Sequence, residues 1–368
     1  MNGEMWVFGG RPVGALIVGL LLCVSSALAE GPKAGFDPKQ GGFFLADESG
    51  DNKLVIQARV QTRLEWNVLE GSDGIAFSVP RARLTLKGRV FDPRLTFKFQ
   101  TDFGKGSVAL KDFYADWRFV KGWLHFRVGQ WKRPFSRQQI NSSGALNFVD
   151  RAITDKGFKA GRDIGIAFHN NYEKSPGFEW ALGLFNGTGD KGQFTGSGFT
   201  NVPRRFLPAL VARVGFNHGG IKGYTEPDLK GGPLRFAIGA STVANFDVSE
   251  NDTASVYGGL DLALKAHGFS ANAAAYVSAI GNAISAVEFD ALGGHVEAGY
   301  VIAGVAQPML RYAAIDPDGA DNLVQEASVG LNIFAFGHGL KWVTDGSVLL
   351  TEGKDTAYRL RTQIQLGF

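Results

Sequence analysis

The stretch KLVIQARVQTRLEW, residues 53–66, alternates two kinds of side chain from its first residue to its last. Leu54, Ile56 and Trp66 fall on one face of an extended chain, whereas Arg59 and Arg63 fall on the other. Because successive side chains of a β-strand point to opposite faces, this pattern predicts a strand that is apolar on one side and solvated on the other. The strand is also long, since strands in globular proteins average about five or six residues.

The same alternation returns along the rest of the chain. It recurs in RARLTLKGRV (81–90), in RLTFKFQTDF (94–103) and finally in YRLRTQIQLGF (358–368). Continued over the whole sequence, the pattern predicts about 16 strands, an even number that is typical of large bacterial membrane barrels. Because we find neither helical heptads nor a linker, residues 51–368 are predicted to form a single all-β domain.

The connections between these strands alternate in length. FDPR (91–94) and VKG (120–122) are short, whereas residues 131–161 and 186–208 form long segments. Short periplasmic turns and long outer loops are the habit of bacterial outer-membrane barrels. Residues 217–233 depart from this rule, because a short turn is expected there and the segment is long and rich in glycine.

The direction of the apolar face decides between a membrane barrel and a secreted soluble β protein, which packs that face inward. In a membrane, turning residues 81–89 inside out would place Arg81, Arg83, Lys87 and Arg89 in lipid, at roughly 2–4 kcal/mol each near the bilayer centre. A closed sheet of about 16 strands also encloses a lumen too wide for side chains to fill. The sequence therefore predicts a transmembrane antiparallel β-barrel with apolar side chains facing lipid and polar side chains facing a wet lumen.

Cations outnumber anions on the polar faces, although the formal net charge of the whole chain is only +3. Rings of cations in a narrow pore concentrate anions, and the arginine fork can bond two phosphate oxygens at once. The alternative is that these cations only pair with carboxylates across the barrel. The predicted anion path consists of Arg59, Arg63, Arg81, Arg83, Lys87, Arg89, Arg94, Lys98 and Arg127.

The beginning of the chain carries a predicted export signal. Residues 12–29 form the one long apolar run, and they end in Ala27-Leu28-Ala29, the small-x-small pattern that a signal peptidase cuts. We predict a cleaved signal peptide over residues 1–29 and a periplasmic lead-in over residues 30–50, with an N-terminal membrane helix as the alternative. Together with the barrel pattern, export predicts the outer membrane of a Gram-negative bacterium as the location.

The last predicted strand places Ile364, Leu366 and Phe368 on its lipid-facing side. An exported strand that ends on an aromatic residue at the membrane edge resembles the C-terminal signal that the outer-membrane assembly machinery recognises. We therefore predict that these three residues form that signal.

Motifs for other functions are weak. GTGDKG (187–192) has the GxGxxG spacing, but more glycine and serine follow it instead of a helix. The histidines are scattered without metal-ligand spacing, and no GxSxG nucleophile motif occurs. We expect no enzyme activity, no cofactor, no metal and no nucleic-acid partner. An adhesin or structural barrel, and an outer-membrane hydrolase with a Ser-His pair on its rim, are the alternatives.

Several stretches, taken in order, resemble the phosphate-selective porin O and P family. They are RVGQWKRPFSRQQINSSG (127–144), FVDRAI (148–153), GRDIGIAFHN (161–170), LGLFNGTG (182–189), VGLNIFAFGHGLKW (329–342) and RLRTQIQLGF (359–368). The resemblance implies a barrel of sixteen strands, usually a homotrimer, that conducts anions and in its best-understood members prefers phosphate or polyphosphate. No dedicated phosphate site aligns residue by residue in this chain, so a general small-solute porin without phosphate preference is the alternative.

The segment 131–161 follows the fifth predicted strand, which makes it the third outer loop. General porins fold this loop into the pore, and we expect it to form the constriction here. An exposed loop with ordinary solvated charges is the alternative. The predicted constriction residues are Lys132, Arg133, Arg137, Asp150, Arg151, Lys156 and Lys159.

Overall fold

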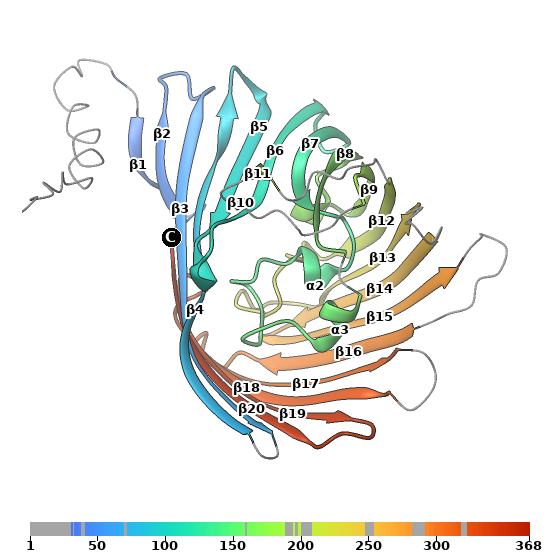
Figure 1. The fold of residues 1–368 in the computed structure, drawn as a ribbon. Coiled ribbons are helices and arrows are strands. Elements are labelled where there is room, and N and C mark those ends of the chain that lie inside the picture. The colour runs from blue at the N-terminus through green and yellow to red at the C-terminus, as the bar shows by residue number, and fades with distance from the viewer. Residues whose placement is uncertain are drawn as a thin grey trace, which may run out of the picture.

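The strands pair in sequence order, each antiparallel to the next, and close into a barrel (Figure 1). In the computed structural model, one sheet of 18 strands combines the barrel wall with a short hairpin, β1 (Lys33–Asp37) and β2 (Gly42–Ala46), which leaves 16 strands for the wall. The structure describes residues 31, 33–37, 41–69, 72–158, 160–187, 194–195, 198–199, 208–246, 254–281, 291–317 and 322–368. The predicted signal peptide therefore lies outside the described residues.

The wall strands agree in number and order with the sequence prediction. They are β3 (Lys53–Leu69), β4 (Ser72–Val90), β5 (Asp92–Asp102), β6 (Ala109–Val120), β7 (Leu124–Lys132), β8 (Arg162–His169), β9 (Phe178–Phe185), β12 (Ala209–His218), β13 (Arg235–Asn245), β14 (Ala254–Ala266), β15 (Phe269–Gly281), β16 (Ala291–Tyr300), β17 (Ala306–Asp316), β18 (Val324–Phe336), β19 (Leu340–Thr351) and β20 (Ala357–Gly367). A separate pair, β10 (Phe194–Thr195) and β11 (Gly198–Phe199), lies in the connection between β9 and β12.

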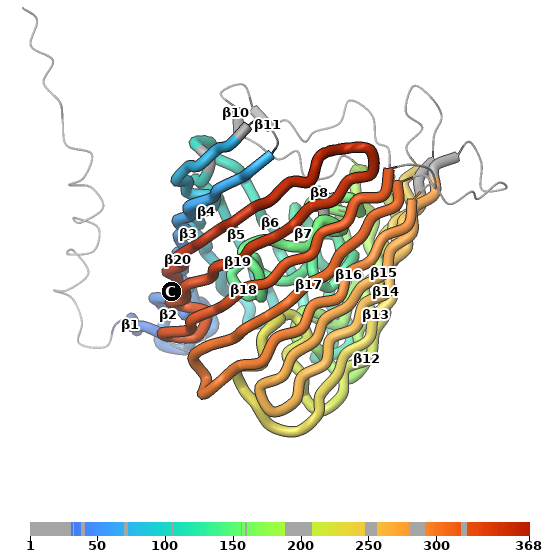
Figure 2. The backbone as a smooth tube through the Cα atoms, turned by 90° about the horizontal axis from the view of Figure 1, so that it is seen from below, coloured from blue at the N-terminus to red at the C-terminus, as the bar shows by residue number. Residues whose placement is uncertain are grey.

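The barrel closes between the first and last strands of its wall. Arg59 of β3 lies opposite Gly367 of β20, and Phe368 exchanges two backbone hydrogen bonds with Ala58. In Figure 2 the strands on the side toward the viewer, from β13 to β20, share one inclination, and the C-terminus lies beside β1 and β2. Inclined strands are a geometric requirement for closing a sheet into a barrel.

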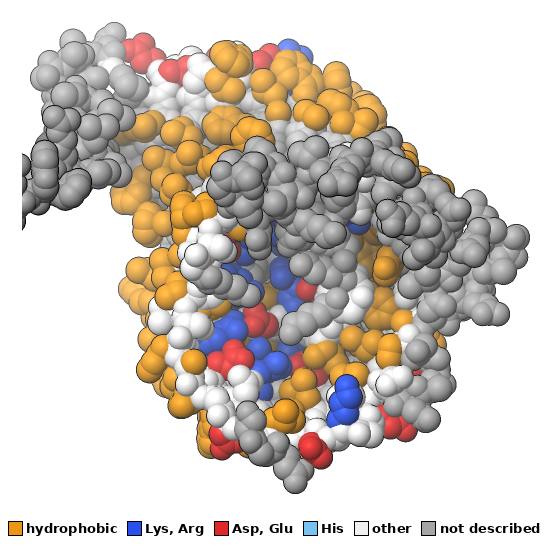
Figure 3. Space-filling model, in the orientation of Figure 1, with side chains coloured by type: hydrophobic (Ala, Val, Ile, Leu, Met, Phe, Trp, Pro, Cys, Tyr) orange, Lys and Arg blue, Asp and Glu red, His pale blue; other side chains and the backbone are white. Residues whose placement is uncertain are grey.

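Side chains on β20 show which face of the wall meets lipid. Leu360, Ile364 and Leu366 have exposed fractions of 48%, 60% and 54%, whereas the intervening Arg361 and Gln363 are only 3% and 2% exposed. Figure 3 shows the same division, with hydrophobic side chains over the outside and charged side chains within the hollow. This confirms the predicted register, with apolar side chains outward and polar side chains toward the lumen.

Two features of the wall differ from the sequence expectation. The hairpin β1–β2 occupies part of the predicted periplasmic lead-in, for which no strand was predicted, and β2 pairs with the first residues of β3, beyond the end of β20. Strands of five residues give too short an alternation to detect reliably.

Strand β4 also differs, because it begins at Ser72, well before Arg81. A register shift opposite Gln61–Arg63 lets the strand include Pro80. A proline removes a ladder hydrogen bond, so it is tolerated where a bulge interrupts pairing.

Two long segments enter the lumen from opposite ends of the barrel. The third outer loop, residues 133–161 and here called L3, carries the short helices α2 (Arg137–Ile140) and α3 (Ile153–Gly157) inside the ring of strands (Figure 1). The predicted inward fold of this loop is confirmed. From the periplasmic end, residues 219–234 reach L3, where the Glu226 N–H donates to the Ala145 carbonyl at 3.0 Å. This second inward segment explains why residues 217–233 are too long for a simple turn.

Two 3-10 turns complete the described elements, η1 (Gly104–Gly106) in the second outer loop and η2 (Tyr172–Lys174) in the turn between β8 and β9. No described helix is both long and apolar enough to cross a membrane.

Candidate functional site

L3 fills one side of the lumen because it packs an apolar face against the wall. Phe135 and Phe158 of the loop are buried against Tyr276 of β15, and the cluster continues to Trp131 and Phe185. The rings of Phe158 and Tyr276 are stacked with their centroids 5.3 Å apart. Burying several aromatic rings stabilises the loop by several kcal/mol, at roughly 25 cal/mol per Å² of apolar surface. L3 is therefore a fixed part of the lumen.

Cations of the wall and of the loop hold the L3 backbone. Lys132 Nζ donates to the carbonyls of Ile140 and Asn141 at 3.0 and 2.7 Å. Lys341 Nζ donates to the Leu146 carbonyl at 2.8 Å. Arg151 Nε donates to the Gln138 carbonyl at 2.7 Å, and its Nη2 reaches two further carbonyls. A buried carbonyl without a hydrogen-bond donor lowers the stability of the folded protein. These hydrogen bonds therefore fix the course of the loop.

The wall behind L3 is electrically balanced. Arg213 lies between Asp261 and Glu179, with N–O distances of 2.7 and 3.0 Å, and none of the three side chains is more than 2% exposed. Arg137 of L3 joins the same group through Asp261 at 2.8 Å. Farther along the chain, Arg311 pairs with Glu326 at 2.8 Å. A buried cation needs such partners, because removing a charge from water costs several kcal/mol.

The open space lies along the opposite wall, formed by β3–β7 and β20 and here called the near wall. Four cavities of about 340–480 Å³ follow it. We name them by position and by a pair of lining residues: the outer cavity (Glu326, Arg359), the arginine cavity (Lys111, Arg162), the inner cavity (Arg59, Gln100) and the lower cavity (Arg94, Arg118). Since liquid water occupies about 30 Å³ per molecule, each cavity has room for a hydrated small ion.

Neighbouring cavities share lining residues, so the four cavities lie in series along the near wall. The outer and arginine cavities share Arg63 and Asp150, and the arginine and inner cavities share Arg83. The inner and lower cavities share Lys87 and Lys98. Figure 3 shows blue side chains gathered within this hollow. The result is a cation-lined path beside the near wall, displaced from the centre of the barrel by L3.

Several cations on this path, including Arg59 and Lys87, form no salt bridge with a carboxylate of the described residues. The two Nη groups of Arg59 donate hydrogen bonds to the hydroxyls of Ser142 and Ser143, at 2.8 and 3.0 Å. Lys87 lines the inner and lower cavities without a salt bridge. Arg83 is paired with Asp102 at 2.7 Å, and its Nη1 donates to Ser143 Oγ. These side chains present positive charge to open space, which attracts anions.

The structure places the nine residues of the predicted anion path in different roles. Arg59, Arg63, Arg81, Arg83, Lys87 and Lys98 line the three upper cavities. Arg89 lines the lower cavity and donates to the Gly50 carbonyl. Arg94 is paired with the neighbouring Asp92 at 2.7 Å, and its side chain is 51% exposed. Arg127 is buried, pairs with Asp116 at 2.8 Å and lies over the Tyr114 ring.

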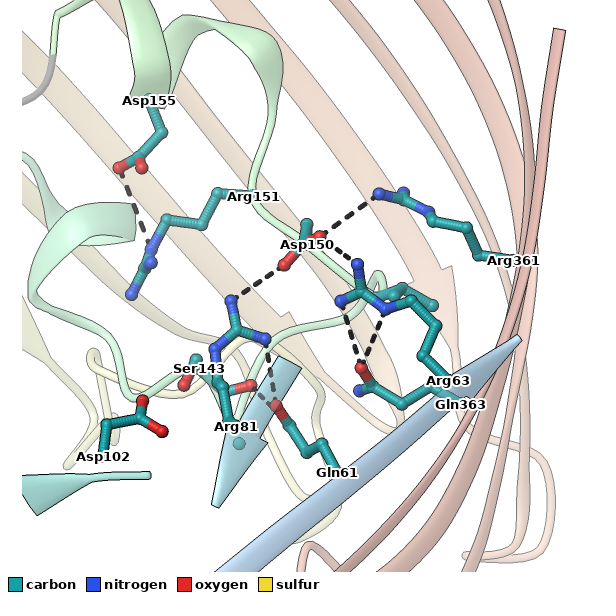
Figure 4. Close-up of polar contacts among 12 residues, drawn as sticks. Gln61, Arg63, Arg81, Asp102, Ser143, Asp150, Arg151, Asp155, Arg361 and Gln363 are labelled. Atoms are coloured by element: carbon teal, nitrogen blue, oxygen red, sulfur yellow. Dashed lines mark hydrogen bonds and ion pairs between the residues drawn. The ribbon is translucent and has the colours of Figure 1, made fainter. Parts of the chain in front are cut away.

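The predicted constriction residues also divide. Lys132, Asp150 and Arg151 line the arginine cavity. Arg133 and Arg137 are buried, and each contacts a carboxylate, Asp163 for Arg133 and Asp261 for Arg137. Lys159 lies outside the described residues, as does the side chain of Lys156. Several cations of the loop thus hold structure, while Asp150 projects toward the path (Figure 4).

Sequence reasoning missed residues that act through distant contacts. The hydroxyls of Ser142 and Ser143, which face Arg59, gave no signal in the alternating pattern. The histidines are scattered in the sequence, but the fold brings two of them together. The rings of His125 and His169 are stacked beside Asp116, with their centroids 5.2 Å apart. These three residues have ligand atoms close enough for a metal ion. However, His169 Nδ1 accepts the Asn171 N–H, so its Nε2 carries the proton and donates to Asp116.

A closed sixteen-stranded barrel with an apolar outside, an inward third loop and a charged path through its lumen defines a pore-forming protein of the outer membrane. The family model for phosphate-selective porin O and P matches residues 61–332. The chain therefore belongs to the phosphate-selective porin O and P family.

Solved structures support the fold at low sequence identity. The anion-selective porin of Comamonas acidovorans is 13% identical, with a TM-score of 0.54, over 86% of this chain and 99% of that chain. The outer membrane channel DcaP of Acinetobacter baumannii is 14% identical, with a TM-score of 0.57, over 88% and 99%. Pseudomonas putida OprB is 11% identical, with a TM-score of 0.59, over 86% and 94%. The comparison with curated proteins gave no match.

Proposed function

We propose that this chain forms a water-filled channel in the outer membrane that passes small anions by diffusion and prefers them over cations. The observation that carries the proposal is the near wall, where Arg59 and Lys87 face open cavities without a carboxylate partner among the described residues. Family membership and the inward L3 support the same function. A charged wall beside a low-dielectric barrel concentrates counter-ions, and here those counter-ions are anions.

Phosphate is the anion that we propose the channel prefers. Arginine donors suit a tetrahedral oxyanion because two N–H groups of one guanidinium can bond two oxygens. Arg59, Arg81 and Arg83 lie on the adjacent strands β3 and β4, and Arg59 is directly opposite Arg83. A general anion porin, in which any small anion passes equally well, is the second candidate.

The proposal includes how the protein reaches its membrane. Export by a signal peptide over residues 1–29 brings it to the periplasm of a Gram-negative cell. The assembly machinery then recognises the last strand, where Ile364, Leu366 and Phe368 share the outward face. We also propose a homotrimer, in line with the family. An outer membrane protein of Vibrio cholerae, OmpT, with a similar fold is described in a trimer form, at 11% identity and a TM-score of 0.55 over 86% of this chain and 99% of that chain.

Planar-bilayer recording of the purified protein tests the channel and its selectivity. Under a KCl gradient the reversal potential should show anion preference, and added inorganic phosphate should reduce the chloride current. Replacing both Arg81 and Arg83 with Glu should lower the anion preference while the folded barrel persists. Both side chains line the path and carry their charge into the arginine cavity.

Three results would separate the alternatives. Cation preference of the native channel contradicts the proposal. Anion preference without phosphate block indicates the general anion porin. Absence of conductance from folded protein favours an adhesin or structural barrel.

A further inference from the structure

Asp150 of L3 occupies the centre of an arginine cluster on the near wall. Its Oδ1 lies 2.8 Å from Arg81 Nη2, and its Oδ2 lies 2.8 Å from Arg63 Nη1. Arg361 Nη1 approaches the same Oδ2 at 3.4 Å. Figure 4 shows the three guanidinium groups converging on this one carboxylate from three strands.

This geometry resembles the one that a permeating oxyanion would adopt. Strands β3, β4 and β20 each supply one arginine, and the donors approach both oxygens of the carboxylate. A phosphate or carboxylate ion is commonly held by this arrangement of guanidinium donors. The side chain of Asp150 therefore stands where the near wall would otherwise offer three guanidinium groups to an anion.

Asp150 also lies where two cavities meet. The outer and arginine cavities share Arg63, Pro80, Asp150 and Arg151. The side chain of Asp150 is 30% exposed, whereas those of Arg63 and Arg361 are 7% and 3% exposed. An ion that moves from one cavity to the other thus meets a partly exposed negative charge within a group of mostly buried positive ones.

Backbone contacts also hold this part of L3 to the wall, besides the carboxylate of Asp150. Arg311 Nη1 donates to the Asp150 backbone carbonyl at 2.9 Å, and the Val149 N–H donates to Asp345 Oδ2 at 2.9 Å. Burial alone would raise the pKa of Asp150, but Arg81 and Arg63 lower that pKa more, to well below its usual range. The side chain of Asp150 is therefore ionised at any physiological pH. Because the backbone contacts remain, Asp150→Asn should leave the loop in place.

We propose that Asp150 is a specificity-determining residue, a fixed carboxylate that occupies the arginine cluster and weakens its hold on passing anions, most of all on those with two charges. The proposal rests on the proposed function. A channel conducts well only if an ion binds strongly enough to enter and weakly enough to leave. Because Coulomb energy scales with the charge of the ion, Asp150 acts more on hydrogen phosphate or sulfate than on chloride.

The test compares native protein with Asp150→Asn in planar bilayers at pH 8. The variant should have an anion-over-cation permeability ratio about fivefold higher, the effect of one unit charge at contact distance in water. The concentrations of inorganic phosphate and of sulfate that block half of the chloride current should fall by at least the same factor. An unchanged permeability ratio together with an unchanged or higher half-blocking concentration overturns the proposal.

Two further variants keep the result interpretable. Asp150→Glu retains the charge and should keep the native permeability ratio, which separates the role of charge from that of shape. Asp92→Asn is a matched control, because Asp92 also pairs with an arginine and its side chain is 29% exposed, but it lies at the periplasmic turn before Arg94. If the native channel proves to prefer cations, the proposed function fails. The shift from native to Asp150→Asn still reports on the proposal for Asp150.

Discussion

At the scale of single residues, the cations of the lumen are of two kinds that the sequence pattern does not distinguish. Arg213 lies between Asp261 and Glu179, and its side chain is 0% exposed. Replacing Arg213 with Met should leave Asp261 and Glu179 with Arg137 as their one cation partner among the described residues, at a cost of roughly 3–5 kcal/mol. The temperature at which the folded band disappears in heat-modifiability gels should fall clearly.

Lys87 provides the matched control for this prediction. It lies on the polar face of β4 without a salt bridge among the described residues, and it lines two cavities. Lys87→Met should change the free energy of unfolding by less than about 0.5 kcal/mol, as for other substitutions away from paired groups, and should reduce the anion preference. The opposite pattern, with stability lost in Lys87→Met and selectivity in Arg213→Met, would contradict this division of roles.

At the scale of elements, the lumen is shaped by two segments that meet from opposite ends of the barrel. Glu226 of the segment 219–234 accepts the Asn147 N–H at 2.5 Å and Asn141 Nδ2 at 3.3 Å. Glu226→Ala should leave these buried donors of L3 unsatisfied, at about 1–3 kcal/mol each. Because the strand ladder of the wall is untouched, we expect a folded barrel with a looser L3, seen as larger current fluctuations in single-channel recordings.

The control for this change lies in the same segment. Lys230 is exposed, so Lys230→Ala should leave the recordings as in the native protein. Equal fluctuations in native protein and Glu226→Ala would show that L3 is held without help from the periplasmic segment.

How much the sequence predicts depends on the range of the contacts involved. The alternation in residues 53–66 is local, so it predicts the strand, its two unlike faces and, once repeated, a large sheet. The outward direction of the apolar face follows from the cost of placing the cations of residues 81–89 in lipid. The contact between Asn147 and Glu226 joins residues 79 positions apart, and no local pattern records it. The sequence likewise gives no sign of what Arg133 and Arg137 contact, so their charges alone led to the prediction that they line the constriction. Their carboxylate partners, Asp163 and Asp261, come from strands β8 and β14.

At the scale of the whole molecule, the proposed selectivity depends on where charges lie and not on their sum. The chain carries a formal net charge of only +3. Acids balance the wall behind L3, whereas Arg59 and Lys87 leave the near wall positive. In the proposed channel, passing ions follow that wall, because L3 fills the other side of the lumen. A nearly neutral protein can therefore present a strongly positive path.

This arrangement predicts a dependence on ionic strength. The Debye length is about 10 Å in 0.1 M salt and about 3 Å in 1 M salt. Charges on one wall therefore act across much of the path in dilute salt and only at contact in concentrated salt. With a fixed ratio of KCl concentrations across the bilayer, the anion-over-cation permeability ratio should fall as the mean concentration rises from 0.1 to 1 M. The double variant with Glu at positions 81 and 83 should show a smaller fall, because it starts with less positive charge on the path. A ratio that stays constant over this range would place selectivity in close-contact binding at the arginine cluster, since contact interactions are screened far less than the field of the wall.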